Sequence, residues 1–164
     1  MPSVSVSRAF AAPPAQVWAL ISDVQNARRW NSAWAFIEFL SSQRHGIGVT
    51  FRARTEDGDA FDFEITEWQP GEHIAFAPVR AGDWQPYPIA LESHSFHLAP
   101  APDGGTTVTI TAVASVHGLR GRLAGLFFWP GHQKAGLNVA MDALQEALAA
   151  ADLVGPEPET TRSD

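Results

Sequence analysis

The sequence predicts an α+β domain in which a seven-stranded antiparallel sheet is covered by a long C-terminal helix. Polar and apolar residues alternate in one N-terminal segment and in six segments between residues 34 and 116, as they do in half-buried strands. Glycine, proline and aspartate turns separate those six segments closely, which is typical of an antiparallel meander. After Leu119 the apolar spacing becomes helical, and no other element is long enough to cover the sheet.

The N-terminal segment is expected to form a strand followed by two short helices. Residues 3–10 alternate between polar and apolar side chains. The Pro13–Pro14 pair ends that strand and can begin a helix, because a proline in the first turn loses no needed N–H group. Residues 17–24 carry apolar side chains at helical spacing, and Asp23 can cap a second short helix that ends near Trp30.

The six later strands are expected at residues 34–40, 48–54, 60–68, 73–79, 89–98 and 106–116. Charge helps to predict the register of one hairpin. A three-residue loop at Asp57–Asp59 pairs Ala53 with Phe63 on the apolar face. It also sets Arg54 opposite Asp62 on the other face, where opposite charges attract.

The C-terminal helix shows apolar residues at spacings of 4, 3 and 4, namely Leu137, Met141, Leu144 and Leu148. Pro130-Gly131 is expected to kink or break it, since proline removes a backbone hydrogen bond. Residues 1–151 are expected to form one domain, and the polar, proline-bearing residues 152–164 a disordered tail.

Composition excludes several classes of function. The net charge is −7 and Lys134 is the only lysine, which argues against nucleic acid and against anionic membrane surfaces as partners. The chain has no cysteine, so disulfides, thiolate nucleophiles and cysteine-ligated zinc are excluded. No apolar run approaches the roughly 18 residues of a membrane span. We therefore expect a cytoplasmic protein with no membrane insertion.

Among the six histidines, none forms a metal-binding motif on a helix. His94 and His97 are three apart on a strand and so point to opposite faces. We expect neither a metal nor another cofactor.

Glu92 and His94 are the candidate catalytic pair. Two positions apart on one strand, they share a face with Phe96 and Leu98, which suggests that the face points inward. In a regular strand Ile89 would lie on the opposite face, so the strand either contains a β-bulge or has both of its faces partly covered. The pair is then a general base with its orienting carboxylate, a buried structural pair, or a solvent-facing polar pair.

Aromatic residues are abundant, with six Trp and ten Phe against one Tyr. They either fill the core or line an apolar cavity. Trp84 and Tyr87 lie in a loop at residues 80–88 that is a lid, a contact surface, or a loop folded back on the core. The run Phe127–Trp129 is too wide for one helical stripe, so we expect part of it at the surface, where a homodimer contact is one interpretation. Two arginines and a lysine are few for a membrane-surface helix.

The order of these motifs resembles the START-like or Bet v 1-like (SRPBCC) superfamily, in particular its polyketide cyclase/dehydrase and lipid transport branch. The resemblance is carried by "APPAQVWALISDVQNARRW", "GIGVTF", "ITEWQPGEHIAF", "GTTVTIT" and "GLNVAMDALQEAL". It covers about residues 3 to 150 and implies a helix-grip fold, with the sheet curved around the last helix and a cavity between them.

The function that this resemblance implies is binding of a small hydrophobic or polyketide-like molecule inside the cavity. The expected ligand-binding residues are Trp30, Trp34, Phe36, Phe63, Phe76, Trp84, Tyr87, Phe96, Leu137 and Met141, with Glu92 and His94 as the polar anchor. One alternative is a polyketide cyclase or dehydratase that uses His94 as its general base. Another is a non-catalytic interaction protein whose side chains fill the cavity.

Overall fold

The computed structural model describes residues 1–79 and 88–153. Its elements follow one another in the order β1 (Ser3–Phe10), α1 (Pro14–Ile21), the 3-10 helix η1 (Val24–Arg29), β2 (Phe36–Phe39), β3 (Thr50–Arg54), β4 (Ala60–Gln69), β5 (His73–Pro78), β6 (Ile89–Pro100), β7 (Thr106–Val116), α2 (Gly118–Phe127) and α3 (Trp129–Leu153). Expectations for Trp84, Tyr87 and the tail beyond residue 153 lie outside the described residues.

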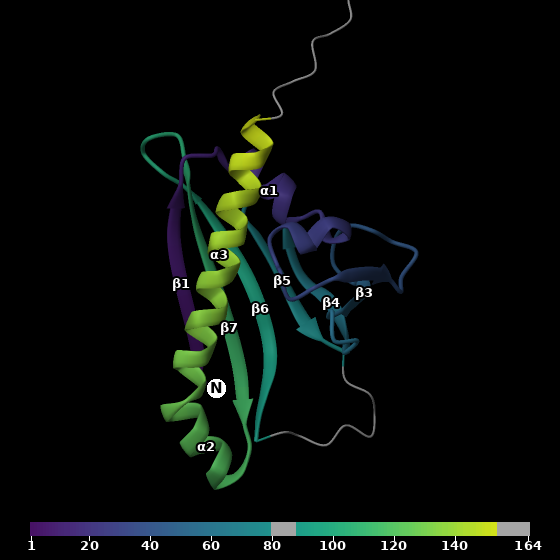
Figure 1. The fold of residues 1–164 in the computed structure, drawn as a ribbon, viewed down its shortest axis with the longest axis vertical. Coiled ribbons are helices and arrows are strands. Elements are labelled where there is room, and N and C mark those ends of the chain that lie inside the picture. Colours follow the sequence, from purple (N-terminus) through teal and green to yellow (C-terminus); the bar gives the residue numbers. More distant parts are fainter. Residues whose placement is uncertain (80–87, 154–164) are drawn as a thin grey trace, which may run out of the picture.

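The seven strands form one antiparallel sheet in the order β1-β7-β6-β5-β4-β3-β2. Helix α3 runs along one face of this curved sheet and packs chiefly against β1 (Figure 1). Helix α1 and η1 lie at the other end of the molecule from α2. The α+β helix-grip architecture expected from the sequence is therefore confirmed.

Both short N-terminal helices form, but the second is not capped as expected. Helix α1 begins at Pro14, directly after the extended Pro13. Asp23 stands before η1, yet its carboxylate makes no capping bond to the backbone. It accepts a 2.7 Å hydrogen bond from the side-chain amide of Asn26 instead.

The register of the β3–β4 hairpin differs from the expected one by two residues. Phe63 lies opposite Phe51, not opposite Ala53. The connection is longer than the three residues expected, because residues 55–59 close it: the N–H of Thr55 donates to the carbonyl of Asp59 at 2.9 Å. Because the register shifts by an even number of residues, each side chain stays on the face of the sheet that the alternation predicted.

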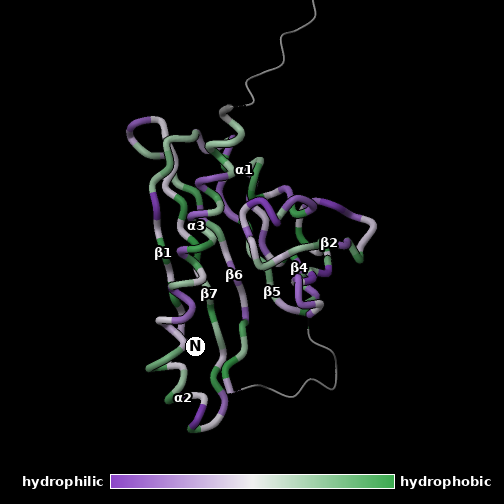
Figure 2. Tube along the Cα trace, viewed as in Figure 1, coloured by the Kyte–Doolittle hydropathy of each residue, from purple (hydrophilic) through white to green (hydrophobic). Residues whose placement is uncertain are grey.

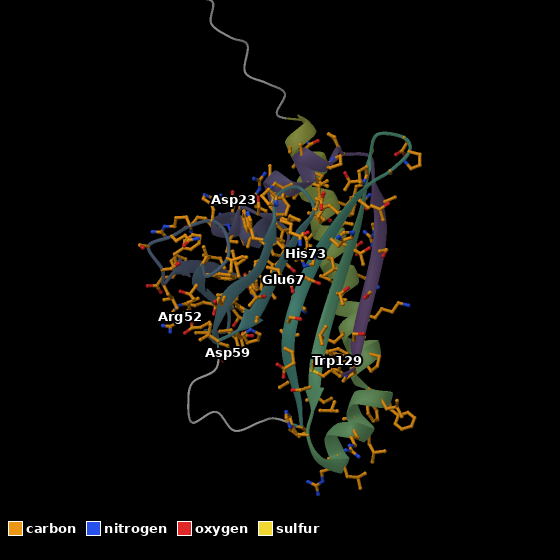
Figure 3. The ribbon with its side chains drawn as sticks, turned by 180° about the vertical axis from the view of Figure 1, so that it is seen from behind. Asp23, Arg52, Asp59, Glu67, His73 and Trp129 are labelled. Atoms are coloured by element: carbon orange, nitrogen blue, oxygen red, sulfur yellow. The ribbon has the colours of Figure 1, made fainter. Side chains whose placement is uncertain are left out.

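This register sets Arg52 directly opposite Asp62 on the outer face (Figure 3 labels Arg52). The guanidinium donates two hydrogen bonds to the carboxylate, at 2.6 and 2.8 Å. Those hydrogen bonds lower the pKa of Asp62 from its ordinary value, with the nearby positive charge adding to the effect. Both side chains are about one-third exposed, so the pair stabilises the fold only modestly.

The C-terminal helix breaks where proline was expected to break it. Helix α2 ends at Phe127, and α3 begins at Trp129, one residue before Pro130. Proline has no N–H group to continue the α2 hydrogen-bond ladder, so it fits best in the first turn of the new helix. The buried side of α3 carries the expected apolar residues Leu137, Met141, Leu144 and Leu148. Arg8 of β1 binds Asp142 of α3 at 2.7 Å and ties the edge strand to the helix.

Candidate functional site

A β-bulge determines which residues of β6 face the interior. The pairing of β6 with β7 shifts between Leu91 and Ser93. Leu91 lies opposite the buried Ala114, and His94 lies opposite the buried Ala112. Leu91 and His94 therefore lie on the inner face of the sheet. The bulge explains why odd-numbered residues face inward before it and even-numbered residues after it.

Glu92 lies between the two register pairs that flank this bulge, Leu91–Ala114 and Ser93–Val113. Simple alternation therefore does not relate its side chain to that of His94, as the sequence interpretation assumed. Its partnership with His94 stays a prediction.

His94 lies on the inner face of β6. Its neighbours across the two adjacent strands are Phe76 on β5 and Ala112 on β7. The Nε2 atom is buried and has no hydrogen-bond partner in the described part of the chain. Burial lowers the pKa of His94 from its ordinary value of 6.5, because the charged imidazolium loses its hydration. The imidazole is therefore neutral at pH 7.

Trp30 supplies a second buried polar atom of the same kind. It directly follows η1 and is held there by a 3.1 Å hydrogen bond from its N–H to the carbonyl of Ala27. Its side chain is only 2% exposed, and its indole Nε1 has no partner among the described residues. A buried polar group without a partner costs about 1–3 kcal/mol, so two in one core call for an explanation.

Six aromatic side chains in contact with one another lie in the same buried core and form what we call the aromatic cluster: Trp30, Trp34, Phe51, Phe63, Phe76 and Phe96. The ring centroids of Trp30 lie 5.0 Å from Phe96 and 6.4 Å from Phe76. Phe76 also neighbours His94 across the β5–β6 pair. The edge-to-face and tilted contacts are those of a packed core with an apolar, low-dielectric character.

Most of the expected lining residues are buried. Trp34, Phe63, Phe76 and Phe96 belong to the aromatic cluster, while Leu137 and Met141 are buried on α3.

Among the expected lining residues that the structure describes, Phe36 is the exception, since it is 57% exposed and lies on the outer face of β2. Trp34 precedes the strand in a turn, where its N–H donates to the carbonyl of Asn31. Alternation begins only at Phe36, so Ile37 takes the inward position. Phe36 is therefore not an interior lining residue.

The lining residues expected from the sequence did not include Phe51, which contacts Trp34, Phe63 and Phe76 and is fully buried. The alternation of residues 49–53 places it on the inner face and could have identified it. No pattern in the sequence could have shown that the nitrogen atoms of His94 and Trp30 lack partners.

Two open surface pockets lie beside η1, with volumes of about 290 and 220 Å³. Their walls include Asp23 and Arg44 in the first and Arg28 and Phe36 in the second. Neither is lined by His94 or the aromatic cluster, so we do not place the candidate site in them. Figure 3 shows Asp23 on this side of the molecule.

Within residues 1–79 and 88–153, no group of three or more histidine or acidic side chains could hold a metal ion. No helix of that part is long and apolar enough to cross a bilayer.

The chemistry of the site follows from its two nitrogen atoms. An indole N–H can only donate a hydrogen bond, so Trp30 requires an acceptor. A neutral imidazole can donate or accept at Nε2, depending on its tautomer. A carbonyl or hydroxyl oxygen within an otherwise apolar molecule could meet either requirement.

Comparison with known proteins agrees with this fold. The model of a family described as "Polyketide cyclase / dehydrase and lipid transport" matches residues 1–150. A comparison with curated protein sequences gave no significant match.

Several solved structures are similar. The XoxI protein of Bacillus cereus superposes with a TM-score of 0.72 at 15% identity, covering 93% of this chain and 99% of that one. The Aha1 dimer of Colwellia psychrerythraea gives 0.63 at 17% identity, covering 90% and 96%. DynU16, from the dynemicin biosynthetic locus, gives 0.64 at 20% identity, covering 92% of this chain and 48% of its own. These similarities show the fold.

Proposed function

Because the chain belongs to the polyketide cyclase/dehydrase and lipid transport family, we propose that it binds a small hydrophobic molecule on the inner face of its sheet. The oxygen atom of this molecule would contact Nε2 of His94 and Nε1 of Trp30. The observation that carries the proposal is the presence, beside the aromatic cluster, of two buried nitrogen atoms that have no hydrogen-bond partner among residues 1–79 and 88–153. Pockets for such ligands are mostly apolar, with a few polar groups that fix the orientation.

The ligand would be neutral. Burial disfavours the charged form of His94, and the surrounding rings are apolar. Burying a carboxylate there without a cation would cost far more than burying a hydroxyl or a carbonyl group. A phenol or a ketone therefore fits better than a fatty acid anion.

Calorimetric titration with naphthol and with naphthoate tests this preference, because the two compounds share a ring system and differ in charge. We expect naphthol to bind and naphthoate to bind roughly tenfold or more weakly at pH 7, since excluding an unpaired charge is worth at least 1.4 kcal/mol. His94→Leu should weaken naphthol binding by a similar factor, because it removes one of the two polar contacts.

The matched control is His97→Leu, which removes an exposed imidazole from the opposite face of the same strand. Equal affinity for both compounds, or naphthol binding that His94→Leu leaves unchanged, would contradict the proposed site. Failure of both compounds to bind would favour an interaction protein whose interior is filled by the aromatic cluster.

Proton transfer is a second candidate function, favoured by the buried Nε2 of His94, which has no hydrogen-bond partner in the described part of the chain. In the Nδ1-protonated tautomer this atom would accept a proton from a carbon next to a carbonyl group. The indole N–H of Trp30 would donate to the oxygen, where the charge develops. Base-catalysed exchange of deuterium into a bound ketone, lost in His94→Leu and retained in His97→Leu, is the test.

A further inference from the structure

Helix α2 carries its large apolar side chains on the outside. Leu119, Leu123, Leu126 and Phe127, with Phe128 directly after the helix, are between 51% and 77% exposed. We call these five residues the α2 apolar surface. Figure 1 shows α2 at one end of the molecule, beyond β6 and β7, and Figure 2 shows the hydrophobic residues in it.

The inner side of α2 consists of glycine. A Cβ atom on Gly121 would lie 2.1 Å from the carbonyl oxygen of Pro88, and one on Gly125 would lie 2.7 Å from Val116. These two positions thus admit no side chain at the present distance between the helix and the sheet. Packing against the sheet therefore uses the small residues and leaves the large ones unburied.

The two arginines of α2 stand at the edges of the apolar surface. Successive side chains of a helix are turned by about 100° around its axis. In this projection the large apolar side chains of α2 fall within one arc of roughly 100°, and they are Leu119, Leu123, Leu126 and Phe127. Arg120 lies beside one edge of this arc and Arg122 beside the other, and both are exposed. An apolar stripe flanked by basic side chains is typical of helices that lie in a membrane interface.

The stretch of sequence that contains α2 also differs in charge from the whole chain. The net charge is −7, yet no acidic residue occurs between Asp103 and Asp142. The same interval contains Arg120, Arg122 and Lys134. Basic groups beside an anionic bilayer strengthen binding, while the acidic residues lie elsewhere in the sequence.

We propose that α2 is a peripheral membrane-docking helix that inserts the α2 apolar surface into the interface of an anionic lipid bilayer. Counting charge over the whole sequence argues against such a partner, but the local charge of α2 and the exposure of its apolar residues favour it. The docking does not depend on the proposed ligand, and it needs no membrane-spanning helix.

A second copy of the chain is the competing occupant. The charge pattern favours the lipid, because a contact between two α2 helices would bring the arginines of both copies close together. An anionic headgroup layer would instead neutralise them.

Sedimentation with lipid vesicles tests the proposal. We expect the protein to partition onto vesicles of equal parts phosphatidylcholine and phosphatidylglycerol, and much less onto phosphatidylcholine alone. The double variant Arg120→Gln/Arg122→Gln should lower this partitioning roughly 30-fold, since each basic group near the surface contributes a factor of about five. Leu123→Gln/Phe127→Gln should lower it roughly tenfold or more by removing inserted apolar area.

Ile47→Gln is the matched control, because Ile47 is an exposed apolar residue in the β2–β3 connection, away from α2. Circular dichroism would show that the variants stay folded. Absence of binding to anionic vesicles, or binding that both α2 variants retain, would overturn the proposal. The proposal would also be overturned if light scattering showed a dimer that Leu123→Gln/Phe127→Gln dissociates, and the wild-type protein did not bind vesicles.

Discussion

Replacing His94 with leucine should stabilise the protein, although most substitutions in a core destabilise it. The Nε2 atom is buried and has no hydrogen-bond partner among the residues that the structure describes, which costs about 1–3 kcal/mol. Leucine has a similar volume, has no polar atom, and would face Phe76 and Ala112 on the neighbouring strands. Allowing for some strain, we expect the free energy of unfolding to rise by about 1–2 kcal/mol at pH 7.5. For a chain of this size that corresponds to roughly 2–8 °C in Tm.

The gain should grow as the pH falls. Because burial lowers the pKa of folded His94 below 6.5, the unfolded chain binds the proton first on acidification. The wild type therefore loses stability as the pH drops below about 6.5, by up to about 1.4 kcal/mol per pH unit, and His94→Leu lacks this contribution. Well above pH 6.5, His94 is neutral in both the folded and the unfolded chain, so its contribution to the free energy of unfolding no longer changes with pH.

Urea unfolding of wild type, His94→Leu and the control His97→Leu at about pH 7.5 and about pH 5.5 measures both effects. The proteins should be refolded from denaturant first, so that any bound molecule is removed. A His94→Leu variant that is less stable at pH 7.5, or a gap that does not widen at pH 5.5, would refute the reasoning.

Two further predictions concern packing. Gly121→Ala should destabilise the protein by about 1–3 kcal/mol, because the new methyl group collides with the carbonyl oxygen of Pro88 and forces α2 outward. Thermal unfolding measures this loss, and an unchanged Tm would contradict the close approach of α2 to Pro88. Phe36→Ser should change stability by no more than about 0.5 kcal/mol, since the ring is exposed on the outer face, whereas Phe63→Ala should cost about 3–5 kcal/mol. Similar losses for both would mean that Phe36 is packed in solution.

The fold could be predicted because it depends on patterns that persist along each element. Alternation located all seven strands to within two residues at every boundary, and Pro130 located the helix break. The hairpin register could not be predicted as reliably, because it depends on how the backbone of Thr55 and Asp59 closes the loop. Charge pairing alone could not decide it, because Asp62 lies opposite an arginine in both registers: Arg54 in the expected one and Arg52 in the observed one.

The candidate site was predictable only in part. His94 and Trp30 could be selected by type and position, but the lack of partners for their nitrogen atoms depends on every element around them. The bulge at Glu92 was suggested by a change of phase, yet the direction of the carboxylate was not. Likewise, the exposure of Leu123 and Phe127 follows from the glycine face of α2, which periodicity cannot distinguish from a buried apolar face.

The most direct test of the proposed ligand site is the nuclear magnetic resonance signal of the Trp30 indole N–H during titration with naphthol. Comparison with Trp30→Phe assigns that signal among the six tryptophans. The account predicts a downfield shift of this proton as it forms a hydrogen bond, with the Nε2 signal of His94 changing at the same naphthol concentrations. Binding of naphthol that leaves both signals unmoved would contradict it.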